Sequence, residues 1–141
     1  MAGLNPRVER RLFGLIVCIL AIVPILAGAA GILRGPAMIA GVHSSAADLD
    51  SHFRYLSGLL FAIGLGFVFS VFDIDRRAAL FRALGLIVIA GGVSRLLGAL
   101  SSGLPGTPHR FALVMELIVV PGLMLWLARI RRRAARQRDA Q

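Results

Sequence analysis

The sequence contains no lysine and only one cysteine among its 141 residues. A single cysteine cannot form an intrachain disulfide or a CxxC pair, so thiol–disulfide chemistry within the chain is excluded, and we interpret Cys18 as a small packing residue. All 16 basic residues are arginine, a bias that indicates a GC-rich bacterial genome. The three histidines, His43, His52 and His109, lack a tight ligand spacing such as H-x-x-x-H, so no metal or other cofactor is predicted.

The sequence also lacks a polar stretch long enough for a soluble catalytic domain. Hydrophobic residues make up 57% of the chain, whereas soluble domains contain about 45–50%. A helix that spans a bilayer needs about 20 mostly apolar residues, and four such segments occur, at 12–33, 53–72, 83–100 and 111–128. The predicted fold class is therefore all-α: a polytopic membrane protein with a four-transmembrane-helix bundle, in which residues 1–141 form a single integral membrane domain.

The net charge of +9 does not predict nucleic-acid binding, because the arginines flank the apolar segments. They cluster before the first segment, between the second and third, and in the tail 129–141, at Arg7, Arg10, Arg11, Arg76, Arg77, Arg82, Arg129, Arg131, Arg132, Arg133, Arg136 and Arg138. Basic flanks stay on the cytoplasmic side during insertion. We therefore predict a multi-pass protein of the bacterial cytoplasmic (inner) membrane, embedded in the lipid bilayer, with the N- and C-termini and the basic tail in the cytoplasm.

An alternative interpretation of residues 1–30 is a signal peptide. A basic start and an apolar run precede Ala27-Gly28-Ala29, which resembles a cleavage site. The apolar run continues to Leu33 and exceeds a usual signal-peptide core, which favours a retained first span. If cleavage occurred, three spans would remain and the new N-terminus would lie outside.

Turn formers and prolines predict local breaks in the helices. Gly35-Pro36 indicates a turn, residues 36–42 a short interfacial helix, and Asp48 or Asp50 an N-cap of the second span. Pro121 in the fourth span, like Pro24 in the first, removes one backbone hydrogen bond, and we interpret both as adjustments of helix shape.

Ionisable residues of three spans are predicted to share one layer near the outer surface. Arg95 lies five residues before the outer end of the third span, and Glu116 lies five residues after the outer start of the fourth. At about 1.5 Å per residue the two have nearly equal depth, so they can pair. Arg54 enters the second span from the same side, accompanied by Asp50, His52 and Tyr55.

Small residues predict which helix faces pack closely. On the second span Arg54 begins a row of small residues at every fourth position, continued by Gly58, Ala62, Gly66 and Ser70. On the third span Arg95 shares its face with Gly91, Gly98 and Ala99. Because small residues let membrane helices approach one another, both arginines are expected to point toward neighbouring helices.

The charges in this layer allow three interpretations. Arg54 and Arg95 with Glu116 leave one positive charge in excess, which Asp50 or an anionic ligand could balance. The residues can form a buried salt-bridge network that fixes helix register, a ligand site, or a catalytic site. The predicted site, whichever its role, consists of Arg54, Arg95, Glu116, Asp50, His52 and Tyr55.

Three motifs resemble a known family. DSHFRYLSG at 50–58, GGVSRLLG at 91–98, and Glu116 followed by Pro121 resemble the bacterial domain-of-unknown-function family numbered four-three-four-five. The resemblance implies a small four-helix inner-membrane protein without an assigned activity. The chain is also distantly similar to DoxX-type membrane proteins, some of which accompany quinone- or thiol-linked redox systems; without a cysteine pair, that similarity concerns the fold alone.

The leading functional hypothesis is a non-enzymatic membrane protein with a polar pocket in the outer leaflet. The pocket would bind a lipid-like or anionic small molecule, or a membrane partner subunit, and homo-oligomers are compatible with the glycine row. One alternative is a structural or accessory subunit of a membrane redox or transport assembly. Another is a membrane enzyme that acts on a lipid or quinone headgroup, with Glu116 as proton donor or acceptor.

Overall fold

The computed structural model describes residues 5–39, 42 and 46–139, and within them all regular structure is helical. Four helical stretches are long and apolar enough to cross a membrane. Three are single helices, and the fourth joins α4, a π-helical segment η2 and α5; the elements are α1 (Pro6–Arg34), α2 (Ala47–Val71), α3 (Ile74–Ser102), α4 (Thr107–Val114), η2 (Met115–Val119) and α5 (Val120–Asp139). The predicted all-α class with four potential transmembrane helices is confirmed. The predicted spans lie inside these stretches, except that α2 ends one residue before Phe72.

The chain forms two compact units, which are described separately. The first unit contains Met1–Phe13 and Ile74–Gln141, and the second contains Gly14–Asp73. Helix α1 is continuous through the boundary at Gly14. The single-domain organisation stays a prediction.

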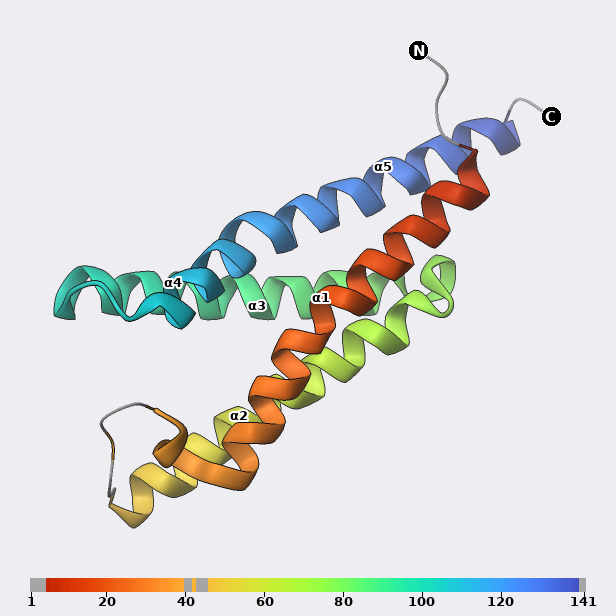
Figure 1. The fold of residues 1–141 in the computed structure, drawn as a ribbon. Coiled ribbons are helices and arrows are strands. Elements are labelled where there is room, and N and C mark those ends of the chain that lie inside the picture. Colours follow the sequence, from red (N-terminus) through yellow and green to blue (C-terminus); the bar gives the residue numbers. More distant parts are fainter. Residues whose placement is uncertain (1–4, 40–41, 43–45, 140–141) are drawn as a thin grey trace. The chain divides into compact units, whose positions relative to one another are not determined.

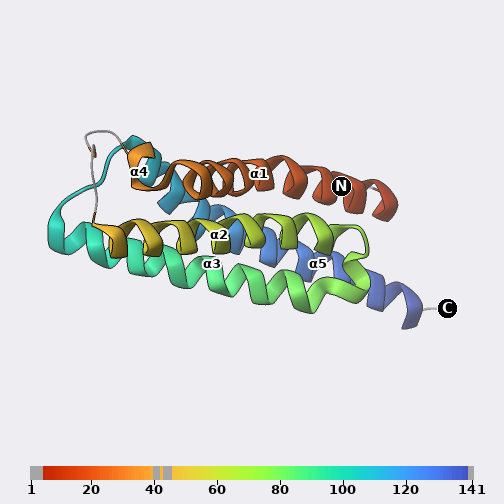
Figure 2. The same cartoon turned by 90° about the horizontal axis from the view of Figure 1, so that it is seen from below.

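In the second unit, α1 and α2 run antiparallel and contact each other through glycines (Figures 1 and 2). A Cβ atom built on Gly28 would lie 2.6 Å from the backbone nitrogen of Phe61. A Cβ atom on Gly64 would lie 2.7 Å from the side chain of Ile25. Only glycine permits this approach of two helix backbones, as is common for helices that pack in membranes.

The buried face of α2 differs from the predicted row of small residues. Its buried residues are Ser57, Gly64, Phe67 and Ser70. A Cβ atom on Gly58 would meet no atom of the second unit within 4 Å. Within the second unit, Ser70 of the predicted row is therefore buried, whereas Gly58 makes no close contact.

The first unit packs the start of α1 against α3 and α5. Phe13 lies between Phe81 and Trp126, with ring centroids 5.5 and 5.3 Å away and an edge-on contact to the indole. Phe13, Phe81 and Leu127 are almost completely buried. Aromatic packing thus holds the N-terminal turns of α1 next to the last helix, and the two helix ends lie close together (Figure 1).

Pro121 coincides with a change in helix type. Proline has no N–H to donate, and the preceding turn, η2, is π-helical, with the Val120 N–H donating to the Met115 carbonyl. Such a segment inserts one extra residue into the helix and rotates the side chains before it relative to those after it. Pro24 lies inside α1, which continues through it.

The connection between α1 and α2 corrects two predictions. The short helix expected over residues 36–42 is the four-residue 3-10 helix η1 (Gly35–Met38), while Ala40 and Gly41 lie outside the described residues. Neither aspartate caps α2: the N-cap residue is Ala46, which makes no side-chain cap. Asp50 instead lies in the first turn, where its carboxylate is used by Arg54.

Candidate functional site

Arg95 of α3 and Glu116 of η2 form a bidentate ion pair. Arg95 Nε donates to Glu116 Oε2 at 3.0 Å, and Arg95 Nη2 donates to Oε1 at 3.1 Å. Two parallel charge-assisted bonds fix both the distance and the orientation of the groups. Glu116 is the partner that the equal-depth argument assigns to Arg95.

The local sequence brings the two helices close enough for this pair. A Cβ atom on Gly92, one turn before Arg95, would lie 2.7 Å from the Cβ of Glu116 and 2.9 Å from the side chain of Leu117. The close-packed glycine of α3 is thus Gly92, whereas a Cβ on Gly91 or Gly98 would meet nothing in the first unit within 4 Å. Within the first unit, the predicted packing face at Gly91 and Gly98 makes no close contact.

The Arg95–Glu116 pair is electrically balanced but keeps unused donors. The Glu116 side chain is 16% exposed and that of Arg95 is 34% exposed. Arg95 Nη1 makes no hydrogen bond to any residue that the structure describes. The guanidinium therefore presents a free N–H edge, and chemically it can bind an acceptor oxygen without needing a second negative charge.

In the second unit, Arg54 of α2 caps the C-terminal end of α1. Its Nε and Nη2 donate to the two carboxylate oxygens of Asp50 at 2.7 and 3.2 Å. Its Nη1 donates to the carbonyls of Ile32 and Leu33 in the last turn of α1. Those carbonyls have no partner within the helix, so Arg54 supplies a side-chain cap from α2.

A glycine is needed at position 35 next to this cap, both for its backbone conformation and for the lack of space for a side chain. It directly follows α1 and has φ of +59°, the left-handed conformation in which helices often end. A Cβ atom there would clash with Asp50 Oδ1 and would lie 2.9 Å from Arg54 Nη2. Asp50 and Arg54 therefore compensate each other's charge and help to fasten the turn after α1.

The six predicted site residues fall into two groups. Arg95 and Glu116 meet in the first unit, and Arg54 and Asp50 meet in the second, on α2, which also carries His52 and Tyr55. His52 and Tyr55 are exposed. That all six line one pocket stays a prediction. Among the described residues, which do not include His43, no group of three or more His, Cys, Asp or Glu side chains could hold a metal ion.

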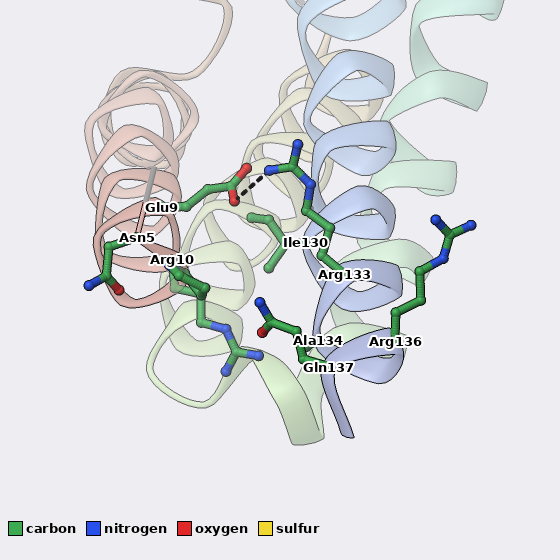
Figure 3. Close-up of a pocket in the computed structure, with 9 residues that line it drawn as sticks. Asn5, Glu9, Arg10, Ile130, Arg133, Ala134, Arg136 and Gln137 are labelled. Atoms are coloured by element: carbon green, nitrogen blue, oxygen red, sulfur yellow. Dashed lines mark hydrogen bonds and ion pairs between the residues drawn. The ribbon is translucent and has the colours of Figure 1, made fainter. Parts of the chain in front are cut away.

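A third polar cluster, which the sequence did not predict, lies in the first unit between the start of α1 and the end of α5 (Figure 3). Glu9 is 8% exposed and accepts hydrogen bonds from Trp126 Nε1 and Arg133 Nη1, both at 3.2 Å. Nearby, Arg10 pairs with Asp75 at the start of α3. The two acidic residues thus connect α1 with α5 and α3.

A periodic signal for Glu9 was present in the sequence. Glu9 begins the series continued by Phe13, Val17 and Ala21, spaced by four, and all four residues are buried. An acidic residue in line with apolar positions indicates a buried carboxylate with partners. Arg7, Arg10 and Arg11 surround Glu9 in the sequence, so the apolar face of the helix was not predicted to extend back to it.

The helices and their ionisable residues indicate the class of protein. Four helices long and apolar enough to cross a membrane, with ionisable residues inside the apolar stretches, are typical of a small multi-pass membrane protein. The chain belongs to the family described as Domain of unknown function (DUF4345), whose model matches residues 12–127. No curated protein and no solved structure matches the chain significantly.

Proposed function

We propose that the protein is a non-enzymatic binding protein of the bacterial inner membrane, with both termini cytoplasmic. Its ligand would be a lipid-like molecule whose headgroup carries an acceptor oxygen, such as a carbonyl or phosphoryl oxygen. The observation that carries this proposal is the Arg95–Glu116 pair, which lies within apolar helices and retains a free guanidinium edge.

The charge balance of the two ion pairs favours a lipid-like ligand over a free anion. Glu116 already neutralises Arg95, and Asp50 already neutralises Arg54. The positive excess that would favour a free anion is therefore absent from these two pairs. The remaining N–H groups of Arg95 favour a polar headgroup attached to an apolar tail, because the surrounding helices are apolar and the tail gains from contact with them.

The π-helical segment supports a binding role for Glu116. Single π-helical turns inside α-helices occur often at functional sites, and Glu116 lies in such a turn. The alternative, in which the charges are structural and the protein is an accessory subunit of a membrane assembly, is favoured by Arg54, whose donors are used by Asp50 and the end of α1.

The test is native mass spectrometry of protein extracted from its native membrane in a mild detergent. Wild-type protein is expected to carry a stoichiometric lipid-like adduct. In Arg95→Lys the ammonium can still pair with Glu116 but lacks the second N–H edge, so the variant should fold and lose the adduct. The matched control is Arg110→Lys, because Arg110 is an exposed arginine whose side chain bonds only Thr107 among the described residues.

An adduct that persists in Arg95→Lys would contradict the proposal. A wild-type protein that carries no adduct but co-purifies with a fixed partner subunit would favour the accessory role instead.

A further inference from the structure

The Glu9 cluster borders an open cleft between the start of α1 and the end of α5. The cleft has a volume of about 400 Å³ and lies entirely within the first unit. Its lining combines basic and amide side chains around one carboxylate, namely Asn5, Glu9, Arg10, Arg133, Arg136 and Gln137 (Figure 3). None of these residues belongs to the Arg95–Glu116 pair.

The charges of the cleft leave it positive. Glu9 is used by Arg133 and Trp126, and Arg10 is held by Asp75, which lies outside the lining. Among the side chains that the structure describes, which in α5 end at Gln137, none forms a hydrogen bond or ion pair with the Arg136 guanidinium. Among these described side chains, three arginines against Glu9 and Asp75 leave one positive charge in excess, and each paired guanidinium retains further N–H donors.

The position of the cleft fits the membrane surface. Its residues lie at 5–10 and 130–137, just outside the apolar runs that begin at residue 12 and end at residue 128. Trp126 lies at the same end of the first unit, as expected for an aromatic residue at the headgroup level. In Figure 3 the Gln137 amide and the Arg10 guanidinium face the space between the two helices, whereas Arg136 extends outward.

We infer that this cleft binds the phosphate group of an anionic phospholipid at the membrane surface. Arg10 and Gln137 donate hydrogen bonds to the phosphate oxygens, and Arg136 contributes its charge at the rim. Glu9 orients Arg133 and limits how much negative charge the cleft accepts. This site is separate from the binding function proposed for Arg95 and Glu116, because it recognises a charged headgroup outside the apolar spans.

The test is a titration of the detergent-solubilised full chain with phosphatidylglycerol, followed by native mass spectrometry. The cleft variant is Arg10→Gln with Arg136→Gln. The matched control is Arg11→Gln with Arg131→Gln, which removes the same charge from the same two helices at exposed positions that do not line the cleft. Phosphatidylcholine and inorganic phosphate serve as comparison probes.

We expect the cleft variant to bind phosphatidylglycerol at least about tenfold more weakly than the control variant, since a hydrogen bond to a charged group is worth about a factor of ten. Glu9→Gln should bind it more tightly than wild type, because Arg133 is released and a repelling charge is removed. Equal losses in the two double variants would overturn the inference in favour of general attraction to the basic tail. Complete displacement of the lipid by millimolar inorganic phosphate would overturn the lipid as the occupant.

Discussion

Replacing Gly35 by alanine tests the role of Arg54 as a cap between helices. The substitution has two costs. The left-handed backbone at φ of +59° costs a residue with a Cβ atom about 1–2 kcal/mol. The new methyl group would also displace Asp50 and Arg54, which it would meet at less than van der Waals distance.

The second cost follows from the hydrogen bonds of Arg54. Its four hydrogen bonds join Asp50 and the carbonyls of Ile32 and Leu33. The Arg54 side chain is 41% exposed, so water competes for its donors and the cap contributes less than a buried network would. Gly35→Ala should therefore lower the free energy of unfolding by more than the backbone term of about 1–2 kcal/mol.

Gly103→Ala is the matched control for this prediction. Gly103 also has a positive φ, of +93°, but a Cβ atom there would meet nothing within 4 Å in its own unit. It should therefore cost only a backbone term, with no side chain displaced. The free energies of unfolding can be measured by steric trapping in bicelles. Equal destabilisation by the two substitutions would refute the assignment of Arg54 as a cap.

Two further predictions concern helix contacts in each unit. Gly28→Ala should destabilise the protein by about 1–3 kcal/mol, because its methyl group would press on the backbone of Phe61. Gly122 has open space around it in its own unit, so Gly122→Ala should stabilise α5 by up to about 1 kcal/mol. Thermal unfolding in detergent measures both changes, and changes of the same sign would contradict the packing. Glu9→Gln should shift the fluorescence emission of Trp126, the only tryptophan in the sequence, because its indole donates to the Glu9 carboxylate; an unchanged spectrum would argue against that contact.

The sequence predicted features that depend on helix length and depth. The four apolar segments lie inside the observed helical stretches, apart from Phe72. The pairing of Arg95 with Glu116 followed from the rise per residue alone, which hardly varies between helices. Depth along a membrane helix can therefore be counted from its sequence with little error.

The sequence did not predict which face of each helix is packed. Errors in rotation accumulate along a helix, so the row that included Gly58 diverged from the buried face that contains Ser57 and Gly64. On α3 the contact glycine was Gly92, one position from Gly91, which is a rotation of about 100°. The Glu9 cluster depends on contacts between residues more than 100 positions apart, and no local pattern encodes such a partner.

The proposed function depends on the binding of a lipid-like ligand by the Arg95–Glu116 pair. The most direct measurement is native mass spectrometry of the swapped variant, Arg95→Glu with Glu116→Arg, beside wild type. The swap keeps an ion pair between α3 and η2 but moves the free N–H edge to the other helix. Our account predicts a folded variant with thermal stability close to that of wild type and at least about a tenfold loss of the bound ligand. A swapped variant that retains the ligand at the wild-type level would contradict it.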